Sequence, residues 1–148
     1  MEKYVAVATA LETDTAYRPR GGAYANYSGP LSRFVKERLT EAWNKHLSVR
    51  EACDGWYSGA YLLETIPSVL YILMCHGQDL EESMVRAVND TKDNDTIAAI
   101  VGAAVGALHC KKAIPVRWIR NLSGRTMDRD DGKVFEILAR ARDVWDEP

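Results

Sequence analysis

Hydrophobic positions recur every three to four residues along most of the chain, which is the spacing of amphipathic helices. No stretch alternates between apolar and polar residues as a half-buried strand does. The pattern therefore predicts an all-α protein. The expected helices cover residues 4–11, 30–47, 58–75, 79–89, 93–108, 115–122 and 133–145, with residues 49–56 as a brief connector.

Several helix starts have recognisable signals. Pro30 suits a first turn, and Asp79 with Glu82 three residues later is typical of a capped start. Pro67 either kinks its helix or starts the main segment of that helix. The predicted core faces of the second and fourth helices consist of Leu31, Phe34, Val35, Leu39, Trp43 and Leu47, and of Leu80, Met84, Val85 and Val88.

The segment of residues 97–108 is apolar and rich in small side chains, with Ala98, Gly102 and Gly106 four residues apart. A glycine inside a helix costs up to about 1 kcal/mol relative to alanine. Two such glycines imply that close packing against neighbouring helices compensates. We therefore expect a buried, rigid central helix.

Oxygen-bearing side chains are dense just before this helix. Asp93 and Asp95, followed at once by Thr96, suit a small hard cation such as Mg²⁺, which prefers oxygen ligands. The same residue types also cap the free amides at a helix start. From the residues alone, a metal site and simple helix capping both stay open.

A longer comparison favours the metal site. The run of residues 93–108, followed by Ile114-Pro115 and Trp118, resembles the C-terminal signature of the ADP-ribosylglycohydrolase family. Residues 59–67 and 87–89 resemble the segments that precede this signature in the same order. Members of that family are all-α hydrolases with a two-Mg²⁺ site that release ADP-ribose. The resemblance implies that Asp93, Asp95 and Thr96 bind metal, and that the ligand contacts are Tyr57, Ser58, Gly59, Tyr61 and Asn89.

The chain also departs from that family pattern. The family's N-terminal acidic element, a Thr-Asp-Asp run with a separate Glu, has no counterpart here, and residues 13–15 are only a superficial echo. We therefore expect a match to the C-terminal half alone. Asn94 replaces a threonine, and Lys92 replaces a small residue. A cation at Lys92 would compete with a metal unless its stem turns away.

Composition is that of one globular domain. The chain has 148 residues, of which 47% are hydrophobic and 27% are charged, and its formal net charge is −2. We expect a single compact orthogonal helical bundle over 1–148, resembling part of the ADP-ribosylglycohydrolase fold. Within it, residues 1–54 match uncertainly, residues 55–122 carry the resemblance, and residues 123–148 add a C-terminal helix.

The charge gives no basic field that would recruit nucleic acid or an anionic membrane. No signal peptide or membrane-spanning run is visible, so we expect a cytoplasmic protein. The three cysteines are scattered, as for reduced thiols. The pairs Cys75-His76 and His109-Cys110 are better explained as helix-end residues than as zinc ligands, because adjacent side chains point in different directions.

Two further features are open. The loop of residues 13–29, rich in Gly, Tyr and Arg, either contacts ADP-ribose or is a packed or partly mobile connector. Glu64 lies among apolar residues and must either pair, most commonly with an arginine, or face a cleft.

Two functions follow from the sequence. One is an Mg²⁺-dependent ADP-ribosylglycohydrolase-like fragment, for which a second copy or a complementing chain supplies the missing acids. The other is a non-catalytic helical binding module derived from that family. With either function we expect a homo-oligomer, because a chain that corresponds to half of the family fold exposes apolar surface. A third reading is that the polar run only caps its helix and binds nothing.

Overall fold

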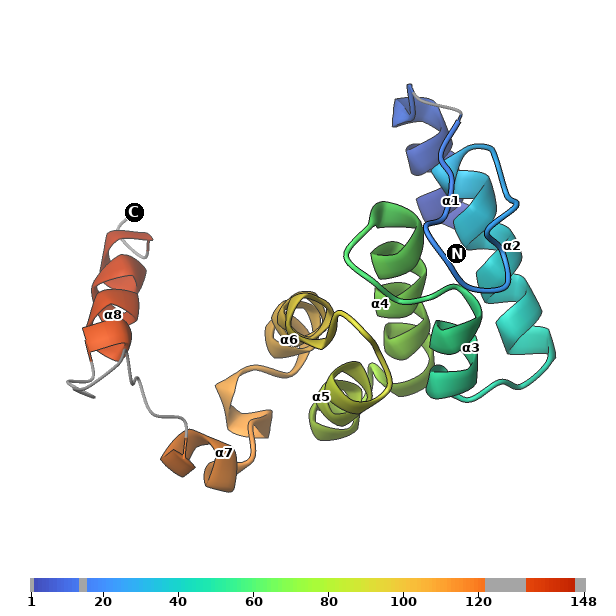
Figure 1. The fold of residues 1–148 in the computed structure, drawn as a ribbon. Helices are drawn as coiled ribbons and strands as arrows, with labels where there is room; N and C mark the ends of the chain where they lie inside the picture. The colour runs from blue at the N-terminus through green and yellow to red at the C-terminus, as the bar shows by residue number, and fades with distance from the viewer. Residues whose placement is uncertain (1, 14–15, 122–132, 146–148) are drawn as a thin grey trace. The chain divides into compact units, whose positions relative to one another are not determined.

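The computed structural model describes residues 2–13, 16–121 and 133–145, and within these ranges the regular structure is helical (Figure 1). An isolated antiparallel bridge between Tyr17 and Gly29 is the sole β-type pairing there. The all-α prediction is confirmed. The elements are α1 (Glu2–Leu11), α2 (Leu31–Asn44), α3 (Val49–Gly55), α4 (Leu62–His76), α5 (Leu80–Asn89), α6 (Asn94–His109), the 3₁₀ turn η1 (Lys111–Ala113), α7 (Val116–Asn121) and α8 (Lys133–Trp145).

Backbone contacts divide the chain into two compact units, Met1–Ala113 and Ile114–Pro148. The first unit holds α1 to η1, and the second holds α7 and α8. Exposed apolar side chains of α8 include Ile137 and Leu138. None of the described helices is both long and apolar enough to cross a bilayer.

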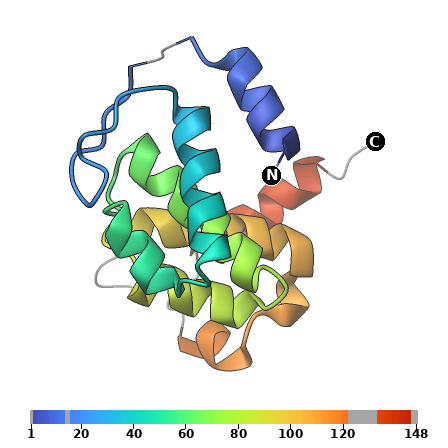
Figure 2. The same cartoon turned by 90° about the vertical axis from the view of Figure 1, so that its right-hand side faces the viewer.

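The core of the first unit is built around α4, which packs on α2, α3, α5 and α6 (Figures 1 and 2). Its Leu63 and Ile72 are fully buried, and Tyr71 packs edge-on against Trp56. Pro67 lies inside the helix. The sequence prediction of residues 93–108 as the central helix is therefore wrong, because α4 has the larger set of helical neighbours.

The connector predicted at residues 49–56 is wrong, because α3 occupies it. Ser48 is its N-cap. The Glu51 amide donates to the Ser48 hydroxyl, and the Ser48 amide donates to the Glu51 carboxylate at 2.8 Å. This reciprocal capping box stabilises a helix too short to show periodicity.

The predicted core faces of α2 and α5 are partly correct. Phe34, Val35 and Leu39 are buried as expected, but Trp43 is 51% exposed. In α5, Leu80 is buried while Val88 is 45% exposed. Two small residues of α5, Ser83 and Ala87, occupy the buried positions instead, because they allow the close approach of α6.

The helix α6 packs mainly on α5, and its buried residues are Ile97, Ala98, Val101 and Val105. The prediction of a buried helix therefore holds for one face of α6. The exposed residues on its other faces are Ala99, Ile100, Ala103, Ala104, Ala107 and Leu108.

The two glycines of α6 differ in their surroundings. A Cβ atom at Gly102 would lie 3.1 Å from the Met84 sulfur, so this glycine permits close packing as expected. A Cβ atom at Gly106 would meet nothing within 4 Å. The inference that packing compensates for both glycines holds at Gly102 and is wrong at Gly106.

Residues 16–29 form a loop that folds onto the helices. The amides and carbonyls of Tyr17 and Gly29 pair at its base, and the Ala23 amide donates to the Gly55 carbonyl at 2.8 Å. The rings of Tyr24 and Tyr27 pack edge-on against Phe34. The loop is therefore packed, and its packing carries Arg20 to α4.

Candidate functional site

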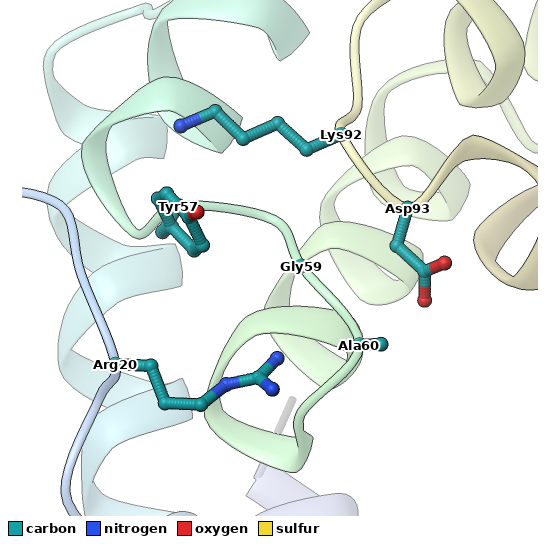
Figure 3. Close-up of a pocket in the computed structure, with 6 residues that line it drawn as sticks. All are labelled: Arg20, Tyr57, Gly59, Ala60, Lys92 and Asp93. Atoms are coloured by element: carbon teal, nitrogen blue, oxygen red, sulfur yellow. The ribbon is translucent and has the colours of Figure 1, made fainter.

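A pocket of about 380 Å³ opens where the loop of residues 16–29 approaches the starts of α4 and α6. Such a volume falls in the usual range of about 300–1,000 Å³ for small-ligand sites. Figure 3 shows its lining side chains converging from three separate segments of the chain. These residues are Arg20, Tyr57, Gly59, Ala60, Lys92 and Asp93.

One wall of the pocket is the connection between α3 and α4. Tyr57 and Ser58 both have positive φ angles, 80° and 40°, which non-glycine residues rarely adopt. Two hydrogen bonds hold this conformation. The Ser58 carbonyl accepts the Asp93 amide at 3.0 Å, and the Ser58 hydroxyl accepts the Lys92 amide at 3.2 Å. The strained turn and the start of α6 are therefore fixed to each other.

Gly59 allows this turn to cross over a buried carboxylate. A Cβ atom at Gly59 would lie 2.5 Å from Glu64 Oε2, so a larger residue would displace the Glu64 carboxylate. Glu64 has no exposed surface. It accepts hydrogen bonds from the Arg20 backbone amide at 3.1 Å, from Nε at 3.2 Å and from Nη2 at 2.8 Å. Glu64 is thus paired with an arginine, as the sequence analysis expected.

Arg20 and Lys92 were not predicted as site residues. The signal for Arg20 was the lone carboxylate of Glu64, which required a cation from elsewhere in the chain. The Arg20 guanidinium carbon lies 5.4 Å from the centre of the Tyr61 ring. Its pKa is raised, chiefly by the hydrogen bond to Glu64, so Arg20 stays charged.

Lys92 turns away from the predicted metal ligands. Its ammonium lies 3.8 Å from the centre of the Tyr57 ring, a cation–π contact. Figure 3 shows its stem running toward Tyr57 while the Asp93 carboxylate points toward Ala60. Lys92 therefore does not neutralise Asp93. The sequence analysis required the Lys92 stem to turn away from a metal bound at Asp93, and the stem does turn away from Asp93.

Asp93 is the N-cap residue of α6, but its side chain makes no capping hydrogen bond. Its Oδ2 atom is buried and has no hydrogen-bond partner among the described residues. A buried carboxylate oxygen is costly to leave unpaired. Simple capping therefore does not account for Asp93.

Asp95 and Thr96 are exposed at the first turn of α6. The Thr96 amide donates to Asp95 Oδ1 at 2.8 Å. This bond, followed by the interaction with the Asp93 carboxyl, lowers the pKa of Asp95. Neighbouring carboxyl groups repel each other when both are ionised, and a cation shared between them would remove that repulsion.

The donor set suits Mg²⁺ on one side only. Asp93, Asp95 and Thr96 offer hard oxygen atoms, but of these three Asp93 lines the pocket, whereas Asp95 and Thr96 do not. Within the residues that the structure describes, no group of three or more His, Cys, Asp or Glu side chains is arranged to hold a metal. Further oxygen ligands would have to come from water, substrate or another chain.

The rest of the polar run before α6 is structural. Asp90 is buried and forms ion pairs with Arg50 at 3.2 Å and with Arg86 at 3.0 Å. The Thr91 hydroxyl donates to the Ala87 carbonyl at 2.6 Å. Asn89, a predicted ligand contact, does not line the pocket; its backbone carbonyl accepts from Arg50.

The remaining predicted contacts differ in exposure. Tyr57 and Gly59 line the pocket, Tyr61 is partly exposed beside Arg20, and Ser58 is fully buried. The sequence analysis explained His109 as a helix-end residue, and at the end of α6 its ring forms a hydrogen bond with the Gly77 carbonyl at 2.7 Å.

The family match to known proteins extends over more of the chain than the resemblance of residues 55–122. The sequence profile of the ADP-ribosylglycohydrolase family matches residues 3–147. An uncharacterized protein of Archaeoglobus fulgidus is 44% identical over 79 residues, which are 53% of this chain and 25% of that protein. The match thus spans about a quarter of that relative's length, and no solved structure matches. Because the profile covers nearly every residue, the chain belongs to the ADP-ribosylglycohydrolase family.

Proposed function

We propose that this chain binds an ADP-ribosyl group in the pocket of Figure 3 and contributes Mg²⁺ ligands to its hydrolysis. The observation that carries the proposal is the unpaired, buried Oδ2 atom of Asp93 beside the Asp95 carboxyl. Membership of a typically metal-dependent family supports the same reading.

Each residue would have a distinct role in such a site. Asp93, Asp95 and the Thr96 hydroxyl would hold Mg²⁺, which when bound polarises a substrate oxygen and orients water. The fixed carboxylates of the first turn of α6 also suit positive charge that develops on the sugar during bond cleavage. The Tyr57 ring would pack against a planar or sugar group of the ligand.

A second function is favoured by the limited donor set. Among the described residues, Asp93 is the carboxylate that lines the pocket, and hydrolysis needs a further group to activate water or the leaving group. A binding module that holds ADP-ribose without turnover needs no such group. For the hydrolase, a second copy or a complementing chain would supply the missing acids, which stays a prediction.

Metal binding is tested first with Mn²⁺, a paramagnetic substitute that shares the preference for oxygen ligands. We expect selective broadening of the amide signals of residues 93–96 in an NMR spectrum and competition by Mg²⁺. Asp93→Asn should abolish the broadening. Asp79→Asn is the matched control, because Asp79 caps α5 away from the pocket and Asn caps a helix equally well.

Release of ADP-ribose from a modified protein, with and without Mg²⁺, then separates the two functions. Mg²⁺-dependent turnover that is lost in Asp93→Asn supports the hydrolase. ADP-ribose binding without turnover, both alone and after mixing with other family chains, leaves the binding module. Absence of both Mn²⁺ broadening and ADP-ribose binding would overturn the proposal as a whole.

A further inference from the structure

We propose that Arg20 and Lys92 form a binding site for a phosphoryl anion across the Tyr57 ring. Both cations line the same pocket, although they come from segments more than 70 residues apart in the sequence. In assigning the diphosphate of an ADP-ribosyl group to this part of the pocket, the inference rests on the proposed function. The anion site itself is testable without it.

Arg20 presents a fixed guanidinium to the pocket. Nε and Nη2 are held by Glu64, which fixes the plane of the group, and 53% of the side chain remains exposed. No hydrogen bond to Nη1 occurs among the described residues, so its donors remain available to a ligand. A planar fork of this kind, already oriented, loses little freedom when it binds a phosphate oxygen.

Lys92 provides a mobile partner. Its side chain is exposed, and the contact that positions its ammonium is the cation–π interaction with Tyr57. It forms no ion pair within the described part of the chain. A cation–π contact is weak at an exposed site. An anion on the pocket side of Tyr57 could therefore draw the ammonium to itself without breaking a salt bridge.

The negative groups of the pocket do not cancel this arrangement. Glu64 is buried beneath the turn, and Arg20 already balances its charge. The Asp93 carboxylate lies on the opposite side of the pocket from the Lys92 ammonium (Figure 3). The Tyr57 ring lies between the Lys92 ammonium and the Arg20 side chain, so an anion held by both cations would require the exposed Lys92 side chain to move toward Arg20 (Figure 3).

Two other basic residues of the surface are each paired with a carboxylate on their own helix. Arg33 pairs with Glu37, and Lys45 pairs with Glu41, each on one exposed helix face. Lys92 also stands where the sequence resemblance expects a small residue, so the site would be particular to this chain.

The probe is sodium pyrophosphate, added without divalent cations at low ionic strength and followed by NMR of the amide signals. We expect saturable shifts at Gly59, Ala60 and Lys92. Lys92→Gln should weaken pyrophosphate binding roughly tenfold, since a charge-assisted hydrogen bond is lost. Lys112→Gln removes the same charge from an exposed lysine outside the pocket and should leave binding unchanged.

The outcomes separate this inference from the proposed function. Absence of pyrophosphate binding, or equal weakening by Lys92→Gln and Lys112→Gln, would overturn the anion site. Pyrophosphate binding without ADP-ribose binding would uphold the site and remove the diphosphate assignment. ADP-ribose binding that is unaffected by Lys92→Gln would keep the proposed function and reject the role of Lys92. A circular dichroism spectrum confirms that each variant is folded.

Discussion

Arg20 donates hydrogen bonds to both carboxylate oxygens of Glu64, which has no exposed surface although its partner lies 44 residues earlier in the chain. The pair fastens the loop of residues 16–29 to α4 and fixes Arg20, which lines the pocket. It is therefore one of the long-range contacts on which the geometry of the site depends.

Removal of the arginine should be costly. Arg20→Leu leaves a buried carboxylate without its cation, whereas Arg33→Leu breaks an exposed ion pair with Glu37. We expect the loss of stability at Arg20 to be roughly threefold or more that at Arg33, because unpairing a buried charge is costly and surface pairs contribute little. Urea unfolding measures both. Equal losses would show that Glu64 does not depend on Arg20.

The glycines of α6 should respond in opposite ways to alanine. Gly106→Ala meets open space and should stabilise the protein by about 0.5–1 kcal/mol through helix propensity. Gly102→Ala places a Cβ atom 3.1 Å from the Met84 sulfur, so the shift required of Met84 should cancel the gain. Thermal unfolding of the two variants compares them directly. A destabilised Gly106→Ala would mean that another group packs there.

Asp95 should make stability depend on pH in the acid range. The hydrogen bond from the Thr96 amide is the largest cause that lowers its folded pKa. Ionised Asp95 therefore contributes stability that is present above the ordinary aspartate pKa of about 3.9 and is lost as the pH falls through the folded pKa. In Asp95→Asn this contribution is absent at every pH.

The measurement is the free energy of unfolding from about pH 6 down to about pH 2, where native carboxylates become protonated. We expect the wild-type curve to fall toward that of Asp95→Asn over this range. Asp54→Asn, at an exposed residue of α3, serves as the control. Parallel curves for the wild type and Asp95→Asn would contradict the lowered pKa.

The three cysteines should differ in reactivity. Cys53 is buried, and burial raises the pKa of its thiol to about 12, whereas Cys75 and Cys110 are exposed. A disulfide reagent at pH 8 should modify Cys75 and Cys110 in the folded protein, since thiolates react rather than thiols. Cys53 should react only after unfolding in urea. Mass spectrometry of the modified peptides identifies each site, and early modification of Cys53 would show that the core opens there.

Much of the helical pattern follows from local sequence. The periodicity of the apolar residues predicted α2, α4, α5 and α6, and the Asp79 cap was found as expected. The helix α3 is too short to show that period, and its residues were predicted as a connector. The Ser48–Glu51 capping box is the local signal that indicates its start. Local signals determine where helices start, because caps and propensities act within one or two turns.

Sequence alone also identified the family and named Tyr57, Gly59 and Asp93, which line the pocket, because each belongs to a continuous motif. Tertiary structure alone decided which helix is central, which face of α6 is exposed, and that Arg20 and Lys92 share a pocket with Asp93. The physical reason is the range of the forces involved. Hydrogen-bond capping and helical period are local, whereas pairing of a buried carboxylate and burial of apolar faces depend on segments that meet only after the chain has folded.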